Sequence, residues 1–175
     1  MSNLEIQESD LHLEGVLRNA EGSTLDKANR QAVRSVVLNS QNEVALLYVQ
    51  KYQYHKLTGG GVEDGEDKLG ALSREIHEEV GVDVVIGNEI GTVIEHRDQY
   101  GQIQTSHAYI SHVSGDGIGQ NFTELESSQG FKLRWVSLNE AAQVLMNDTP
   151  LNYEGRFIQK RDLAILSWAK KALGV

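Results

Sequence analysis

Residues 60–82 read GGVEDGEDKLGALSREIHEEVGV, and the spacing of their apolar side chains constrains the fold more than any other stretch. The apolar residues recur at steps of three and four, as one face of an α-helix requires: Leu69, Leu72, Ile76 and Val80. Asp67 stands where an N-cap is expected, and Gly81 suits the left-handed position that ends a helix. The pattern therefore predicts a helix between Asp67 and Gly81, with one face in a core.

Three carboxylates share a neighbouring face of the predicted helix. Glu75, Glu78 and Glu79 are related by steps of three and four residues, so their side chains lie close together. Like charges at this spacing repel one another, and a cation that binds them removes the repulsion. Carboxylate oxygens are hard ligands that favour Mg²⁺ or Mn²⁺ over zinc. The helix is therefore expected to carry a metal site.

Charge also restricts the partners. The chain has 16 Lys+Arg and 25 Asp+Glu, a net charge of −9, and residues 60–82 hold seven acidic and two basic side chains, which gives −5 for that segment alone. Attraction of duplex nucleic acid needs a basic stripe, so this class of partner is excluded. We expect an anionic small molecule that binds through metal ions. A short nucleotide fits, and the end of an RNA chain stays open.

The constrained positions of the segment follow one known pattern: Gly60, Glu66, Arg74-Glu75-Ile76, Glu78-Glu79 and Gly81-Val82. This arrangement resembles the Nudix box without a mismatch. The resemblance implies a metal-dependent pyrophosphohydrolase, which cleaves a nucleoside diphosphate linked to another moiety by attack of water on phosphorus. It also implies the Nudix-type α/β/α sandwich, a mixed β-sheet flanked by helices.

The resemblance assigns roles to the residues of the box. The carboxylates of Glu75, Glu78 and Glu79 would bind the metal, and the carbonyl of Gly60 would be a further ligand. Arg74 would orient the glutamates through a salt bridge. Thr58 departs from the proline that is common before the glycines, but this change removes no ligand.

A general base must take the proton of the attacking water, and the sequence leaves several candidates. Some family members use a box glutamate, and others use a carboxylate from a distant loop. Glu126 is the favoured outside candidate, ahead of Glu124 in the same loop, and Glu95 is a candidate on a predicted strand.

Substrate binding is expected at the glycine run, Gly59, Gly60 and Gly61, where the backbone can approach a phosphate closely. Tyr100 lies 18 residues beyond the box, where dinucleoside polyphosphate hydrolases of the family often carry tyrosine. The only proline is Pro150, which disfavours the ADP-ribose branch. Oxidised nucleoside triphosphates, nucleotide sugars and RNA 5′ ends stay open as substrates.

Two other functions compete with hydrolysis. The first is a non-catalytic nucleotide sensor on the same scaffold, and the second, more remote, is an isomerase of a prenyl diphosphate. A pure binding protein has no need of all three box glutamates, so hydrolysis is favoured.

The rest of the chain indicates the setting of the protein. At 175 residues and 39% hydrophobic, it is long enough for one domain with a core. It contains no cysteine, which excludes disulfides and thiolate catalysis. No secretory signal is visible, and the longest apolar run, Val44 to Val49, is far below the ~20 residues of a membrane helix. We expect a cytoplasmic protein with no membrane partner.

Two units are expected along the chain. Residues 1–30 would be an N-terminal extension that forms an edge hairpin, a mobile arm or the contact of a homodimer, and residues 31–175 would be the Nudix domain. Apolar runs predict a strand hairpin over 32–38 and 43–50 and further strands over 82–86, 89–96, 102–113 and 131–136.

The remaining segments follow from their composition. A capping box, Ser137 to Glu140, predicts a short helix, and a final helix is expected from 155 to 173. Residues 114–130 are rich in Gly, Ser and acidic residues and are expected to be a surface loop. The family resemblance implies that this loop lies over the site. Strands around one helix and followed by others imply a sheet covered on both faces.

Overall fold

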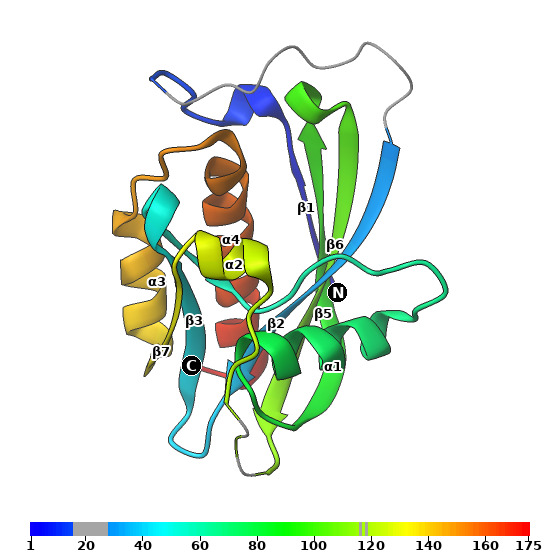
Figure 1. The fold of residues 1–175 in the computed structure, drawn as a ribbon, viewed down its shortest axis with the longest axis vertical. Helices are drawn as coiled ribbons and strands as arrows, with labels where there is room; N and C mark the ends of the chain where they lie inside the picture. The colour runs from blue at the N-terminus through cyan, green and yellow to red at the C-terminus, as the bar shows by residue number, and fades with distance from the viewer. Residues whose placement is uncertain (16–27, 116, 118) are drawn as a thin grey trace.

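The computed structural model describes residues 1–15, 28–115, 117 and 119–175 (Figure 1). Its strands are β1 Ser2–Ile6, β2 Ala28–Leu38, β3 Glu43–Val49, β4 Tyr54–Leu57, β5 Val84–Arg97, β6 Gln102–Val113 and β7 Phe131–Ser137. The α-helices are α1 Lys68–Glu79, α2 Glu124–Ser128, α3 Leu138–Asn147 and α4 Tyr153–Leu173. Short 3₁₀ turns cover Glu8–Asp10, Gln50–Tyr52 and Asp98–Tyr100.

The described strands form one mixed sheet with the order β1-β5-β6-β2-β3-β4, and β7 pairs with β3. The pairs β1/β5 and β2/β6 are parallel, whereas β5/β6, β2/β3, β3/β4 and β3/β7 are antiparallel. β2 meets β3 only at Leu38 and Val44, while β4 pairs with β3 from Leu46 to Val49. β2 and β4 therefore separate from a shared neighbour, and the site forms where they part.

Helices cover both faces of the sheet, which confirms the predicted α/β/α sandwich. On one face α1 packs through Leu72 and Ile76 on Val33 and Val37 of β2. On the other face α3 and α4 enclose a larger core that includes Phe157 and Ile165, and Figure 1 shows these two helices together on the side away from α1. Burial of these apolar side chains is the main favourable term in folding.

Helix α1 begins and ends as predicted. The Oδ1 atom of Asp67 accepts a hydrogen bond from the N–H of Gly70 at 2.7 Å, and Gly81 has a φ of +74°. The prediction that Leu69 belongs to the buried apolar face was wrong, because its side chain is exposed. Ala71 is buried in its place, since the sheet covers the face of the helix centred on Leu72 and Ile76.

Two predicted segments differ from the structure. The separate strands over 82–86 and 89–96 are one strand, β5, because β-bulges between Ile86 and Gly91 absorb the irregular residues without ending the pairing. The predicted loop over 114–130 contains the helix α2. Thr123 caps α2, and Glu126 returns the bond to the Thr123 N–H, a capping box that the loop prediction overlooked.

The two C-terminal helices, α3 and α4, begin close to their predicted positions. α4 begins at Tyr153, two residues before the predicted start, with Asn152 as its N-cap. Ser137 caps α3, as expected, by accepting from the N–H of Glu140. The carboxylate of Glu140, however, lies 3.6 Å from the guanidinium group of Arg134, so it forms an ion pair with a side chain of β7.

The N-terminal residues contribute to the same sheet. β1 lies at its edge beside β5, with Ile6 in the core, and Glu8 accepts a hydrogen bond from the hydroxyl of Tyr153 at 3.0 Å. Residues 16–27 of the predicted extension lie outside the described residues, and the division of the chain at residue 30 stays a prediction.

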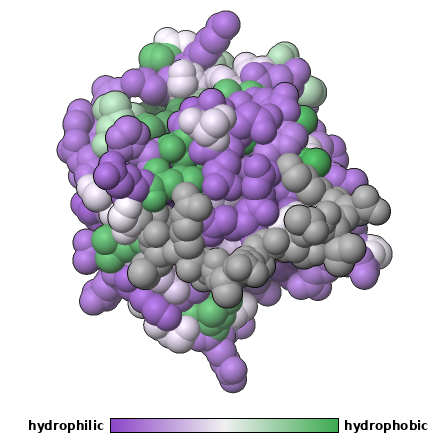
Figure 2. Space-filling view, turned by 90° about the horizontal axis from the view of Figure 1, so that it is seen from above, coloured by the Kyte–Doolittle hydropathy of each residue, from purple (hydrophilic) through white to green (hydrophobic). Residues whose placement is uncertain are grey.

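In the described part of the chain, no helix has the length and apolar character needed to cross a membrane. Figure 2 shows a largely hydrophilic face with small hydrophobic groups.

Candidate active site

The glycine run continues from β4 and lies along the free edge of β2. The N–H of Val33 donates to the carbonyl of Gly60 at 2.9 Å, and the N–H of Ser35 donates to the carbonyl of Thr58 at 2.9 Å. These bonds hold the run in the space between β2 and β4. The glycine run is therefore an ordered wall of the site.

Two positions in this run require glycine. Gly59 has a φ of +132°, and a Cβ there would lie 2.1 Å from the carbonyl oxygen of Val33. A Cβ on Gly60 would lie 2.1 Å from Oε1 of Glu75, where a carboxylate already occupies the space. The run is therefore close to the acidic helix because side chains are absent from it.

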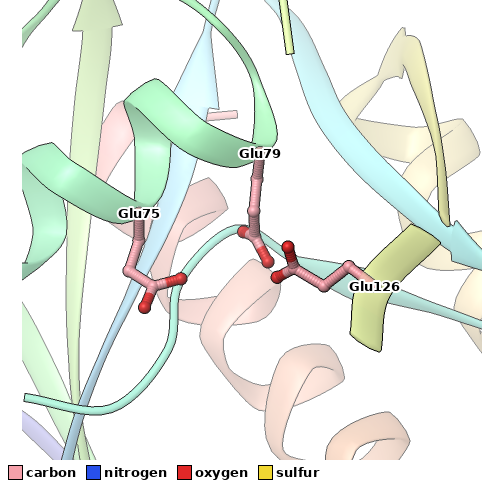
Figure 3. A group of neighbouring side chains, drawn as sticks. All are labelled: Glu75, Glu79 and Glu126. Atoms are coloured by element: carbon pink, nitrogen blue, oxygen red, sulfur yellow. The ribbon is translucent and has the colours of Figure 1, made fainter. Parts of the chain in front are cut away.

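Three carboxylates meet beside the glycine run. Glu75 and Glu79 come from α1, Glu126 comes from α2, and one oxygen of each lies within 4.8 Å of the others. Figure 3 shows the three side chains directed toward a common space. The helix pair was predicted from spacing, while the structure adds Glu126, which the sequence proposed only as a base.

Glu79 is the most buried member of this triad, with no exposed surface. Burial raises its pKa to about 7, although the neighbouring ammonium group of Lys56 acts in the opposite direction. Lys56 Nζ lies 2.6 Å from Oε1 of Glu79, and the N–H of Gly59 donates to Oε2 at 2.8 Å. Lys56 therefore only partly offsets the effect of burial on Glu79.

Lys56 was not predicted as a site residue. It lies on β4, and its ammonium group also donates to the carbonyl of Gly59 at 3.2 Å and lies 5.2 Å from the ring centroid of Phe131. The only signal in the sequence is a lysine inside a strand, just before the glycines. Its partner on α1 is 23 residues away in the chain, so spacing could not identify it.

Arg74 binds the acids around the helix, as the resemblance implied. Its guanidinium group donates to Glu66 Oε1 at 3.0 Å, to Glu75 Oε1 at 2.9 Å and to the carbonyl of Gly61 at 3.1 Å. This network fixes the glycine run and the first carboxylate of the triad relative to each other. Glu78 lies at its edge, with Oε2 at 3.4 Å from Arg74 Nη1, outside the triad.

The carbonyl of Gly60, predicted as a metal ligand, accepts two hydrogen bonds in this structure. One comes from the N–H of Val33 and the other from Nη1 of Arg34 at 3.0 Å. The ligand roles of Gly60 and Glu78 stay predictions. The geometry favours the triad as the donor set for a cation, because its oxygens converge.

The three candidate bases lie in different surroundings. Glu126 joins the triad, held by hydrogen bonds from the N–H and hydroxyl of Thr123 at 2.8 and 2.9 Å. Glu124 begins α2 and is exposed. Glu95 is buried on the α4 side of the sheet, 2.9 Å from Arg97 and 3.5 Å from Arg161. Because Glu95 is bound in these ion pairs, the geometry favours Glu126 as the general base.

Tyr100 lies in the 3₁₀ turn after β5 and packs edge-on against Tyr153, with ring centroids 5.2 Å apart. Its ring is 37% exposed. Tyr100 therefore presents an aromatic surface near the start of α4, and its part in substrate binding stays a prediction.

A cavity of about 240 Å³ joins the triad to two arginines of β2, Arg30 and Arg34. Sequence analysis missed both arginines, because they lie outside the box. A larger cavity of about 570 Å³ is lined by residues that include Tyr48, His55 and Lys132. Its one carboxylate, Asp148, is bound to His55 at 3.0 Å. The carboxylate cluster thus identifies the smaller cavity as the candidate active site.

Comparisons with known proteins identify the family and the fold. The family described as NUDIX domain matches residues 28–155. No curated protein matches the sequence. Among solved structures, the MutT protein from Methanosarcina mazei Go1 is 19% identical, with a TM-score of 0.57 over 85% of this chain and 99% of that chain.

Two further solved structures are similar to this chain. A NUDIX hydrolase from Nitrosomonas europaea is 14% identical, with a TM-score of 0.64, over 83% of this chain and 90% of that chain. An Ap4A hydrolase from C. elegans is 15% identical, with a TM-score of 0.58, over 83% of this chain and 99% of that chain. At such identities the likeness establishes the fold.

Proposed function

Because the chain belongs to the NUDIX domain family, we propose that it is a hydrolase of phosphoric anhydride bonds. It would cleave nucleoside diphosphates linked to another moiety and require Mg²⁺ or Mn²⁺. The family match confirms the resemblance found in the box. The observation that carries the proposal is the triad of Glu75, Glu79 and Glu126 beside a glycine run. The metal requirement and the substrate are the parts that experiment must decide.

The donor set fits a hard divalent cation. All three side chains offer carboxylate oxygens within 4.8 Å of one another, and two cations, Lys56 at Glu79 and Arg74 at Glu75, oppose their three negative charges. Mg²⁺ and Mn²⁺ prefer such oxygen ligands. When bound, the cation would neutralise charge on the diphosphate and activate a water molecule.

Each side chain of the site has a separate proposed role. Glu75 and Glu79 would hold the cation, and Arg74 orients Glu75 through the bond at 2.9 Å. Glu126 would accept the proton of the attacking water, because it joins the triad without an ion pair to any described lysine or arginine. The glycine run would approach the phosphate through its backbone.

A dinucleoside polyphosphate is the favoured substrate within this class. Tyr100 offers an exposed aromatic face on which a base can stack, and one solved structure of the same fold is titled an Ap4A hydrolase. The test is to incubate the protein with Mg²⁺ or Mn²⁺ and a panel of dinucleoside polyphosphates, nucleoside triphosphates, nucleotide sugars and capped RNA 5′ ends. Phosphate, pyrophosphate and nucleotide products are then measured.

The panel also tests the rival function. A sensor would bind one of these nucleotides and release no product, at any metal concentration. Hydrolysis of one compound class in the presence of the cation, lost after chelation, supports the proposal. Full activity with excess EDTA would contradict the metal requirement.

Metal binding is expected to stabilise the folded protein. A cation that binds the folded state alone adds about 2.7 kcal/mol when its concentration is 100 times Kd. For a chain of this size the Tm is expected to rise by about 5–10 °C. Differential scanning fluorimetry with Mn²⁺ measures the shift, and the Glu75→Gln variant, which loses one of the clustered carboxylates, is expected to show a smaller one. An unchanged Tm at millimolar Mn²⁺ argues against the site.

Glu126→Gln is expected to lower kcat by about 10²-fold, because a positioned base typically contributes 10²–10⁴-fold. Its pH–rate profile is also expected to lose the acidic limb that reports this base. Glu124→Gln is the matched control, since Glu124 lies on the same short helix but outside the triad. Steady-state kinetics from pH 5 to 9 measures both variants. Equal rates for the two variants, near that of the wild type, would return the role of base to a box glutamate or to a metal-bound hydroxide.

A further inference from the structure

Two arginines face the triad across its cavity. Arg30 and Arg34 lie on β2 four residues apart, so both side chains point to the same face of the strand. Both line the cavity that also contains Glu75 and Glu79. The cavity therefore has an acidic side on α1 and a basic side on β2.

Arg34 is a buried cation without a carboxylate partner. Its side chain is 5% exposed, and Nη1 donates to the carbonyls of Val33 at 2.6 Å and Gly60 at 3.0 Å. Among the described residues, no carboxylate forms an ion pair with it, and its Nε has no hydrogen-bond partner. Burial lowers the pKa of Arg34 to about 9, with a further contribution from Arg161. A charge in this position is costly until an anion approaches.

The neighbouring acids are already bound to other arginines. Glu95 pairs with Arg97 and Arg161 at 2.9 and 3.5 Å. Asp162 Oδ1 pairs with Arg161 at 2.7 Å, and Glu154 pairs with Arg97 at 3.1 Å. With Arg30 and Arg34 included, four guanidinium groups meet three carboxylates, a surplus of one positive charge.

Arg30 is a second guanidinium group in the cavity without an ion pair to any described carboxylate. Its Nη1 donates to the side-chain carbonyl of Gln104, a neutral partner, and its Nη2 is 2.8 Å from the place of a Cβ on Gly61. It is therefore next to the glycine run but forms no ion pair with the described carboxylates. Both arginines can thus reach an anion that lies against this run.

We propose that Arg34 and Arg30 form a phosphate-binding site for the substrate, opposite the carboxylates, so that one phosphate chain contacts cation and arginines at once. Gly60 connects the two sides, because its carbonyl accepts from Arg34 while its Cα faces the carboxylate of Glu75. Planar guanidinium groups match the oxygens of a phosphate. This inference rests on the proposed function, because it takes the ligand to be a phosphate chain.

The consequence is that phosphate binding does not depend entirely on the metal. Inorganic pyrophosphate is the probe, and isothermal titration calorimetry on the full chain, stripped of metal with a chelating resin, is the measurement. The wild type is expected to bind pyrophosphate without metal. Arg34→Gln is expected to weaken this binding by about 10- to 100-fold, the value of a hydrogen bond to a charged group. Arg30→Gln is expected to weaken it less, because Arg30 is less buried.

Two controls separate binding from folding. Arg134→Gln removes the same charge from an exposed position on β7, outside this cavity, and is expected to bind pyrophosphate as the wild type does. Arg34→Lys keeps the charge but loses the planar group, and its affinity is expected to be intermediate. Mn²⁺ affinity of the Arg34 and Arg30 variants, measured by the same method, is expected to stay within about threefold of the wild type, because neither arginine offers a metal ligand.

Two results would overturn the inference: no binding of pyrophosphate to the metal-free wild type, or the same affinity in Arg34→Gln and Arg30→Gln as in the wild type. If Arg34→Gln does not fold, Arg30→Gln and Arg34→Lys decide the question. Failure of the proposed function is distinguishable, because it would appear as a lack of hydrolysis of the nucleotide panel while arginine-dependent binding of pyrophosphate persists.

Discussion

Glu79→Gln is expected to lower kcat by at least about 10²-fold, the size typical of a lost catalytic group. Glu79 is fully buried, and its carboxylate faces Glu75 and Glu126 at the centre of the site. Glutamine keeps the size of the side chain but removes the charge of a proposed metal ligand, and it places an amide N–H₂ against one of the two donors to Glu79, Lys56 Nζ or the N–H of Gly59. Steady-state kinetics on the substrate found in the nucleotide panel, at saturating Mg²⁺, measures the loss.

Two other variants define what the loss means. Glu75→Gln is expected to act partly through metal affinity, so a higher metal concentration should restore part of its rate. Glu63→Gln is the matched control, because Glu63 lies in the same box with 74% of its side chain exposed. A rate for Glu79→Gln within about threefold of the wild type, well under the ~10²-fold expected of a catalytic group, would show that α1 is not the catalytic element.

Glu95→Gln is expected to reduce the free energy of unfolding by about 3–5 kcal/mol, the usual cost of removing one partner of a buried ion pair. Glu95 has no exposed surface and lies beside Arg97 and Arg161, which the variant would leave with too few anionic partners. For a chain of this length the Tm is expected to fall by roughly 10 °C. Glu154→Gln is the control, because this partner of Arg97 is 41% exposed and is expected to cost about 1 kcal/mol or less.

The same ion pair predicts a dependence of stability on pH. Burial by itself would raise the pKa of Glu95, but Arg97 and Arg161 outweigh burial and lower the pKa to about 2. The folded pKa lies below the unfolded one, about 4.5, so the stabilisation is present above pH 4.5 and is lost as the pH falls toward 2. Urea unfolding of the wild type should lose about 3 kcal/mol of this contribution over that range. The same slope in Glu95→Gln would contradict the assignment.

Local spacing in the sequence was enough to predict the helix of the site and to identify the family. Asp67 and Gly81 mark the ends of α1, and the spacing of Leu72 and Ile76 identifies its buried face. The position of Glu75 next to Glu79 on the helix surface follows from the same periodicity. These features depend on contacts within about four residues, and helical geometry converts such spacings directly into positions in space.

The residues that face this helix could not be predicted from local spacing. Lys56, Arg34 and Glu126 come from β4, β2 and α2, and their contacts with α1 and the glycine run depend on how the strands separate and on how residues 119–121 pack. The N–H of Asn121, for example, donates to the carbonyl of Glu78 at 2.7 Å and so ties the segment before α2 to the end of α1. Such contacts join residues far apart in the chain, and no local periodicity encodes them. For the same reason Glu95, one of three candidate bases in the sequence, was found in a buried ion pair of the core, while Glu126 was found at the site.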